Sequence, residues 1–299
     1  MKKMRRGELI ELALLLVYIC CTQPTYAWAQ AKPSYSKSGF ITTTDNVRLH
    51  YLDAGKGPAI VFVPGLTMPA DIWEPQIRYF SEKHRVIAMD PRSQGESSQA
   101  TEGHYPERRA MDIKEIIDRL NLQPVVLVGW SMGGPEVLSY IDQFGTDTVS
   151  GVVLVDCFVG DEPNPERLAG HFRNIKAIQA NREEWTANWV QSMFAGPQPK
   201  EYFQKLTSAS LRTPTNTMVT LITSTYVVRD DRRAILRKLN RRLLYVARAA
   251  QRSQGEVITA ILPAAQVEIF QNSGHALFVD EADRFNKRLD RFIAELPGK

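Results

Sequence analysis

A serine stands at the centre of the sequence Gly-Trp-Ser-Met-Gly, where it occupies position 131. The apolar run 125–128 before it predicts a buried strand, and the residues after it predict a helix. A serine on a sharp turn between a strand and a helix holds its hydroxyl clear of the sheet, and it needs glycine neighbours because the backbones come close together there. The amino end of the helix favours the negative charge that develops during attack. The pattern therefore predicts that Ser131 is a nucleophile.

A serine hydroxyl becomes an effective nucleophile when a neighbouring base takes its proton. Histidine is a common base, and the chain has five scattered histidines, at positions 50, 84, 104, 171 and 275. His275 lies in Asn-Ser-Gly-His-Ala, between the last predicted strand and the last predicted helix. We expect His50 and His84 in early strand or helix-end contexts, and His104 and His171 on the surface or in a cap. No cysteine and histidine cluster has the spacing of a zinc site, so we expect neither a metal nor a cofactor.

Continuous apolar runs alternate with helical patterns along most of the chain. The runs predict strands at 59–63, 85–89, 125–128 and 149–155, after a hairpin formed by 40–43 and 47–52. Further strands are predicted at 242–247 and 266–270. Apolar residues at helical spacing predict helices at 72–82, 108–120, 136–144, 256–262 and 281–296. Because continuous apolar strands are covered on both faces, this order predicts a mostly parallel sheet of the α/β class, flanked by helices.

Residues 160–231 interrupt the alternation. The strand signal disappears there, and Trp, Gln, Arg and Thr fill helical stretches. A structureless loop of about seventy residues is uncommon inside a compact domain. We therefore expect a helical cap at 160–231, inserted between a first core part at 38–159 and a second core part at 232–299, after a polar linker at 30–37.

The first 29 residues differ from the rest. Four basic residues within the first six precede the apolar run 12–21, and Ala-Trp-Ala ends at position 29. This order predicts a cleavable signal peptide and export to the periplasm or out of the cell. The apolar run is shorter than the ~20 residues of a spanning helix, so we expect no stable membrane span.

The composition is that of a globular protein, with 43% hydrophobic residues. The formal net charge is +4, and removal of residues 1–29, which carry four basic and two acidic side chains, leaves +2. A charge this small gives nucleic-acid binding no electrostatic support. Of the three cysteines only Cys157 lies beyond residue 29, so we expect no intramolecular disulfide.

Residues 38–299 resemble the α/β-hydrolase superfamily. The resemblance rests on the motif around Ser131, on Pro64-Gly65, on Asp-Pro-Arg-Ser-Gln-Gly-Glu-Ser at 90–97, and on Gly274-His275. It implies an eight-stranded, mostly parallel sheet with flanking helices and an inserted helical cap. It also implies that His275 is the catalytic base.

The same resemblance implies an oxyanion hole made by the backbone N–H groups of Leu66 and Met132. The chain departs from the family at Pro64, where the family commonly has the histidine of a His-Gly pair. Because the donor that follows is a backbone N–H, this departure bears on the shape of the hole and leaves both donors in place.

The superfamily usually places its acid after the strand predicted here at 242–247. That loop contains no carboxylate before Glu256. Asp156 ends the strand that follows the nucleophile strand, which is the acid position of some relatives, such as certain haloalkane dehalogenases. A carboxylate there would orient His275 and stabilise its charged form. Asp156 is the first candidate, with a turn-capping role as its alternative. Glu256 is the second, and Asp90 fits turn chemistry.

Apolar side chains near these positions would supply surface for a substrate pocket. They are Trp130, Phe158, Leu277 and Phe278, with Trp185, Trp189 and Phe194 from the predicted cap. Trp185 and Trp189 also match one face of a helix, so plain packing is their alternative use.

These observations favour a hydrolase that cleaves small-molecule carboxylic esters through an acyl-enzyme. A lactonase, an amidase and a cofactor-free perhydrolase are alternatives with the same triad, and a noncatalytic binding protein is an alternative of another class. Dehalogenases and epoxide hydrolases of the superfamily attack with aspartate, so Ser131 argues against both. The sequence does not indicate an oligomeric state.

Overall fold

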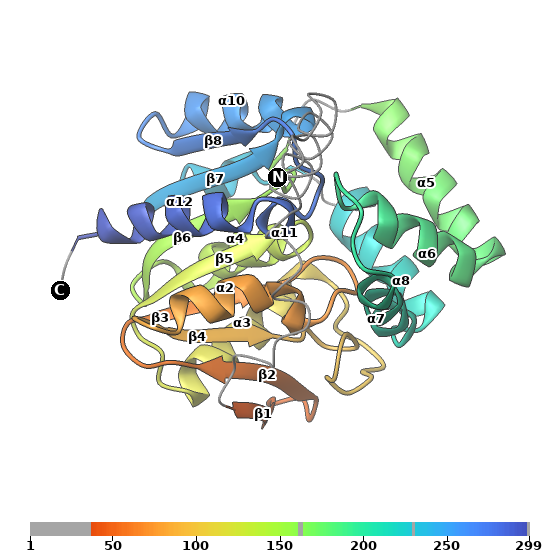
Figure 1. Cartoon of the computed structure of the whole chain (residues 1–299), viewed down its shortest axis with the longest axis horizontal. Coiled ribbons are helices and arrows are strands. Elements are labelled where there is room, and N and C mark those ends of the chain that lie inside the picture. The colour runs from red at the N-terminus through yellow and green to blue at the C-terminus, as the bar shows by residue number, and fades with distance from the viewer. Residues whose placement is uncertain (1–36, 161–163, 229–230, 298–299) are drawn as a thin grey trace, which may run out of the picture. The chain divides into compact units, whose positions relative to one another are not determined.

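An eight-stranded sheet forms the centre of the part of the chain that the computed structural model describes, residues 37–160, 164–228 and 231–297 (Figure 1). The strand order is β1-β2-β4-β3-β5-β6-β7-β8. β2 pairs antiparallel with β1 and β4, and the other neighbours are parallel. The bounds are β1 Lys37–Thr42, β2 Arg48–Ala54, β3 Ala59–Val63, β4 Arg85–Met89, β5 Val125–Trp130, β6 Val149–Val155, β7 Arg242–Arg248 and β8 Gln266–Phe270. The predicted α/β class and mostly parallel eight-stranded sheet are confirmed.

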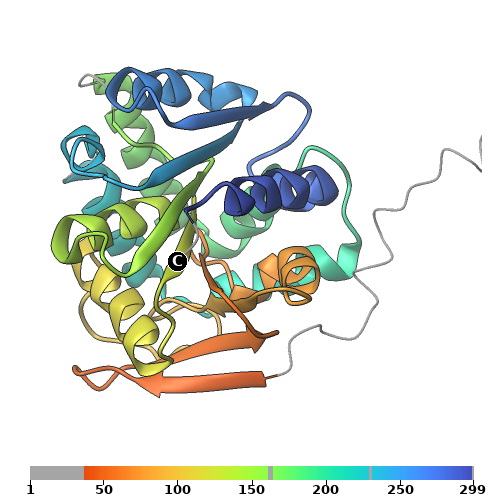
Figure 2. The same ribbon diagram turned by 90° about the vertical axis from the view of Figure 1, so that its left-hand side faces the viewer.

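Helices cover both faces of the sheet (Figure 2). One layer contains α2 (Glu74–Phe80) and α12 (Ala282–Ala294), and the other contains α3 (Pro106–Arg119), α4 (Gly133–Phe144) and α10 (Arg252–Ile261). Every residue of β3 and β5 is buried. This burial explains why these strands are continuous apolar runs instead of alternating ones.

A group of helices follows β6 and precedes β7, in the range for which we predicted a cap. Figure 1 shows α5 to α8 gathered beyond one end of the strands. The bounds are α5 Pro165–Ala180, α6 Arg182–Ser192, α7 Lys200–Leu211, α8 Thr215–Ile222, the π-helical turn η4 Thr223–Val227, and α9 Arg233–Leu236. Figure 1 places α5 to α8 over the edge at which β5 and β6 end, whereas α9 packs against α4 and α10.

Helix α10 begins four residues before the predicted start at 256. Gly255 accounts for the difference, since a glycine next to Ser and Gln indicates a loop when only the sequence is considered. In the structure Gly255 lies inside the helix, where a Cβ atom would come within 2.8 Å of Val267 in β8. The loop after β7 is therefore reduced to the short turn η5, Ala249–Gln251.

The predicted signal peptide and most of the predicted linker lie outside the described residues. Among the helices that the structure does describe, none combines the length and apolar character needed to cross a membrane.

Candidate active site

Ser131 lies on the sharp turn that joins β5 to α4. Its φ angle is +53°, a left-handed conformation that is rare for serine. The two glycines of the motif have a steric reason: a Cβ at Gly129 would lie 2.4 Å from the carbonyl oxygen of Gly133, and one at Gly133 would lie 2.4 Å from that of Val63. The turn thus requires glycine on both sides of Ser131.

The structure brings Asp156 and His275 together. Their Oδ2 and Nδ1 atoms are 2.5 Å apart, and the Asp156 side chain is fully buried. Asp156 follows β6 with a φ of +42°, a conformation that aspartate tolerates better than most residues. The bond to Nδ1 leaves the other ring nitrogen of His275 free to exchange a proton.

Arg248 holds the same carboxylate from the end of β7. Its backbone N–H donates to Asp156 Oδ1 at 2.9 Å, and its Nε lies 3.0 Å from Oδ2. Glu256, the second candidate for the acid, is exposed on α10 and lines neither of the cavities described below. The loop after β7 therefore brings a cation to the acid instead of supplying the acid.

The N–H groups of Leu66 and Met132 flank the turn of Ser131. Within the described chain neither N–H donates to a backbone or side-chain acceptor, which suits a pair of donors kept for an anion. Gln94 fixes the loop that carries Leu66, because its side chain accepts from Thr67 N at 3.0 Å and donates to the oxygen of Gly65 at 3.2 Å.

A buried ion pair stands behind this loop. Arg109 donates to Oε1 of Gln94 at 3.2 Å, and its Nη2 lies 2.9 Å from Glu136 in α4. Burial raises the pKa of Glu136 to about 7, and the charge of Arg109 opposes that rise. The pair links the Leu66 loop to the helix that begins beside Ser131.

The loop of His275 is fastened at several points. Trp130 Nε1 donates to the backbone oxygen of His275 at 2.9 Å. Ala276 N donates to the oxygen of Met193 at 2.8 Å, at the end of α6. Asp280 accepts from the backbone N–H groups of Gly274 at 2.7 Å and Ala195 at 2.9 Å. The loop that carries His275 is therefore held in part by the segment that follows α6.

Two cavities open beside Ser131 and His275, with volumes of about 390 Å³ and about 210 Å³. They share Ser131, His275, His171 and Tyr226. The larger one is walled by Leu66, Asn174, Trp185, Trp189, Ser192, Met193, Ile222 and Arg248. The smaller one is walled by Asp156, Cys157, Phe158, Arg167 and Gln251. Ser131 and His275, both among the described residues, form no direct hydrogen bond with each other. In enzymes without substrate, the hydrogen bond between nucleophile and base is often long.

Only some of the predicted pocket residues line these cavities. Phe158, Trp185 and Trp189 do. Trp130, Leu277, Phe278 and Phe194 do not, so their prediction as pocket walls is wrong for both cavities. Trp130 is turned into the core, where it packs edge-on against Trp73 and Phe278 and supports the His275 loop. Phe194 packs against Tyr202 and Phe203.

Tyr226 and His171 come from the predicted cap, and sequence reasoning missed both as site residues. Their rings stack with centroids 5.4 Å apart. Both residues line the two cavities together with Ser131. Burial raises the pKa of Tyr226 above its usual value, and the nearby charge of Arg232 partly opposes that rise. The phenol therefore stays protonated at neutral pH.

The other histidines do not reach this site. His104 is buried, which corrects its prediction as a surface or cap residue, and it is hydrogen-bonded to Ser93 at 2.9 Å. Burial, with the charges of Arg109 and Arg92, lowers the pKa of His104 to about 4. His50 pairs with Asp90 at 2.7 Å.

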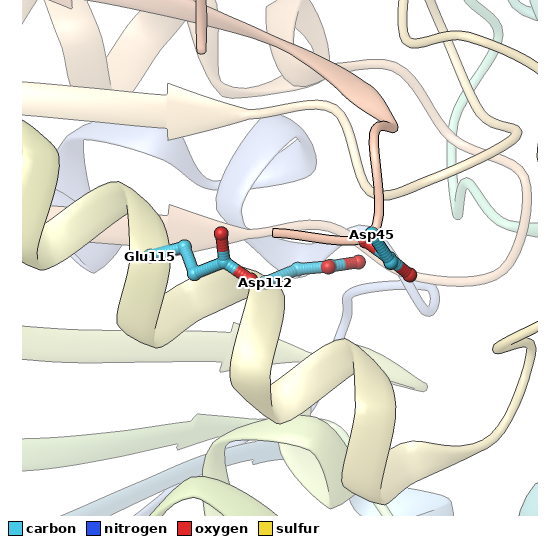
Figure 3. Close-up of side chains that lie close together, drawn as sticks. All are labelled: Asp45, Asp112 and Glu115. Carbon is cyan, nitrogen blue, oxygen red and sulfur yellow. The ribbon is translucent and has the colours of Figure 1, made fainter. Parts of the chain in front are cut away.

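Three carboxylates, Asp45, Asp112 and Glu115, lie close together near the hairpin and α3 (Figure 3). Arg92 contacts Asp112 at 2.6 Å and Asp45 at 2.9 Å, and Arg108 contacts all three acids. Hydrogen bonding to Arg108 holds the pKa of Asp45 far below its usual range. The two guanidinium groups together contact all three acids, so we interpret the cluster as an ion-pair network that fastens the hairpin.

Comparison with known proteins agrees with this geometry. A model of the alpha/beta hydrolase family matches residues 60–288. The chain is 33% identical to a non-heme haloperoxidase of Rhodococcus erythropolis over 52% of this chain and 60% of that protein. It is 36% identical to a bifunctional esterase/perhydrolase of Acinetobacter calcoaceticus over 44% of this chain and 50% of that one.

The match to these two relatives covers 50 to 60% of their own length. Among solved structures, an esterase from Exiguobacterium antarcticum superposes with a TM-score of 0.79 at 24% identity, over 87% of this chain and all of that one. At that level of identity the superposition establishes the fold alone.

Proposed function

The chain belongs to the alpha/beta hydrolase family, and on that premise we propose that it is a serine hydrolase that cleaves carboxylic esters through an acyl-enzyme. The observation that carries the proposal is a serine on a strained turn that shares its cavities with a histidine, whose Nδ1 lies 2.5 Å from a buried aspartate.

In the first half of the reaction, Ser131 Oγ attacks the ester carbonyl carbon while His275 Nε2 takes the hydroxyl proton. Asp156 orients the imidazole through Nδ1 and stabilises the imidazolium. The carbonyl oxygen becomes an oxyanion, which the N–H groups of Leu66 and Met132 stabilise. When the C–O bond of the ester breaks, His275 returns the proton to the leaving alcohol.

In the second half, water attacks the acyl-enzyme. His275 removes a proton from that water and then protonates Ser131 Oγ as the acid leaves. The larger cavity, which contains Trp185, Trp189 and Ile222, offers apolar surface for the acyl or aryl part of the substrate.

Labelling with a fluorophosphonate probe separates this enzyme from a noncatalytic binding protein with the same fold. The wild-type chain should be labelled on the peptide that contains Ser131, and Ser131→Ala should lose that label while it keeps the same melting temperature. A folded wild type that takes no label would refute the proposal. A panel of p-nitrophenyl esters of increasing acyl length, with lactones beside them, then defines the substrate class.

A second activity, perhydrolysis, is favoured by the similarity to the bifunctional esterase/perhydrolase. Hydrogen peroxide would replace water in the second half, and the acyl group would leave as a peracid. Peracid formed from an ester and peroxide in excess of the uncatalysed reaction, and lost in Ser131→Ala, would support it. Hydrolysis without any peracid would restrict the enzyme to water as acceptor.

A further inference from the structure

Tyr226 comes from the helices above the sheet and lines both cavities together with Ser131. It lies in the π-helical turn Thr223–Val227, a kind of helix that is rare and often occurs at functional sites. Its ring stacks on that of His171 at an interplanar angle of 9°. His171 thus holds the ring of Tyr226 from one side, in the wall that both cavities share with Ser131.

The position of Tyr226 between the two cavities indicates which substrate atom it would meet. The residues shared by both cavities are Ser131, His275, His171 and Tyr226. An ester with its acyl part in one cavity and its alcohol part in the other places the scissile bond at this boundary. The leaving oxygen is bonded to the same carbon that Ser131 Oγ attacks. A donor in the cavity wall shared with Ser131 is therefore placed to meet the leaving oxygen as well.

We propose that Tyr226 is a further catalytic residue, whose O–H group donates a hydrogen bond to the leaving oxygen of the ester as the tetrahedral intermediate collapses. The inference rests on the proposed ester hydrolysis. In this step the acyl C–O bond breaks, the electron pair goes to the leaving oxygen, and His275 supplies the proton. Tyr226 keeps its own proton and stabilises the negative charge that precedes proton transfer.

Arg232 fixes the turn that carries Tyr226. Its side chain is buried, and Nη2 donates to the backbone oxygen of Thr225 at 2.8 Å. Its backbone N–H donates to the oxygen of Val159, just beyond Asp156, at 2.9 Å. The phenol is therefore connected to the strand that carries the acid, and its position does not depend on the helices α5 and α6 alone.

The test is the dependence of Tyr226→Phe on the leaving group. An alkoxide is a basic leaving group that needs stabilisation, whereas p-nitrophenolate leaves readily without it. We expect kcat/KM of Tyr226→Phe to fall on the order of 10- to 100-fold for ethyl butyrate, measured by pH-stat, and by less than about 3-fold for p-nitrophenyl butyrate. The melting temperature should stay near the wild-type value.

Tyr202→Phe is the matched control, because Tyr202 is also a buried tyrosine of this helical region but packs against Phe194 and lines neither cavity. It should leave both esters unaffected. Equal losses for the two esters in Tyr226→Phe, or no loss for either, would overturn the catalytic role of Tyr226 while ester hydrolysis stands. Failure of the wild type to hydrolyse either ester would overturn both proposals.

Discussion

Among the residues that the structure describes, serine, histidine and aspartate side chains follow one another in two separate chains. One consists of Ser131, His275 and Asp156, at the ends of the parallel strands. In the other, Ser38 Oγ lies 2.8 Å from His50 Nε2, and His50 Nδ1 lies 2.7 Å from Asp90. In the second chain the serine and the histidine are hydrogen-bonded to each other. Ser131 and His275 do not form such a bond. Residue types and distances alone would therefore select Ser38 as the nucleophile instead of Ser131.

The two chains differ in the backbone around the serine. Ser131 has a strained left-handed conformation at the start of α4, next to the N–H groups of Leu66 and Met132. Ser38 lies in the extended edge strand β1, which is followed by a hairpin and not by a helix. The first arrangement exposes the serine oxygen and places two N–H donors next to the anion that forms during attack. The second arrangement only links its three side chains by hydrogen bonds.

The aspartates also differ in what they hold. Asp90 accepts backbone N–H groups of Ala70 at 2.5 Å and Glu96 at 2.8 Å in addition to His50. It thereby fastens two loops, which agrees with the turn chemistry predicted for it. Asp156 is bonded to His275 and Arg248. Its Oδ1 accepts from the backbone N–H of Arg248 at the end of β7, and its Oδ2 lies 2.5 Å from Nδ1 of His275.

The largest expected effect comes from comparing the two serines. Ser131→Ala should lower ester turnover by at least about 10⁴-fold, because the nucleophile is lost. Ser38→Ala should retain wild-type turnover, and a fluorophosphonate should label the Ser131 peptide alone in digests read by mass spectrometry. A label on Ser38 in the Ser131→Ala variant would remove the distinction between the two chains.

Exchanging the acids is the next comparison. Asp156→Asn should lower kcat by roughly 10³- to 10⁴-fold, because the amide cannot stabilise the imidazolium. Glu256→Gln is the matched control at an exposed position of α10 and should retain activity. Stopped assays with p-nitrophenyl acetate measure both. Near-full activity of Asp156→Asn together with loss in Glu256→Gln would assign the acid to Glu256.

Gln94→Ala tests how much the fixed position of the Leu66 loop contributes to catalysis. The variant removes the bonds to Thr67 N and Gly65 O and leaves the donors themselves in place. We expect kcat to fall on the order of 10-fold, less than the 10²- to 10³-fold that follows loss of a donor. KM should change little, which steady-state kinetics can establish. An unchanged kcat would mean that the Leu66 loop holds its shape without Gln94.

The smallest effect on catalysis is expected from His50→Gln. The substitution breaks the bonds to Ser38 and Asp90 and should cost about 1–3 kcal/mol of unfolding free energy, since a buried carboxylate loses a partner. Turnover by the folded protein should equal that of the wild type. Urea unfolding and activity measured on the same sample separate the two quantities, and a loss of kcat without loss of stability would contradict the comparison.

Much of the scaffold follows from local pattern. The apolar runs at β3, β4 and β6 coincide with the predicted ranges because burial on both faces demands continuous apolar residues. The turn at Ser131 is marked by a local motif, although only Gly129 is required by a contact within a few residues, and Gly133 is required by the distant Val63. The pairing of Asp156 with His275 is implied by the resemblance to the superfamily, and the two side chains lie 2.5 Å apart in the structure.

The parts that escaped prediction depend on long-range placement. Tyr226, His171 and Arg248 belong to segments whose own pattern does not specify what they face. Trp130 was assigned to the pocket from its position beside the nucleophile, but its ring fills the core and its Nε1 serves the His275 loop. Which way a large side chain turns at a strand end is decided by the space that neighbouring elements leave, and the linear sequence does not reveal that space.

The anchoring of the His275 loop has a consequence for protein engineering. Exchange of a helical insert between relatives is a common way to change substrate range, and it assumes that the insert is modular. Here a Cβ on Gly274 would come within 2.5 Å of the Met193 oxygen, and Asp280 binds Ala195 as well as the base loop. A transplanted insert would therefore need a compatible segment at 193–195. Without it, the exchange would misalign His275 as well as change the substrate range.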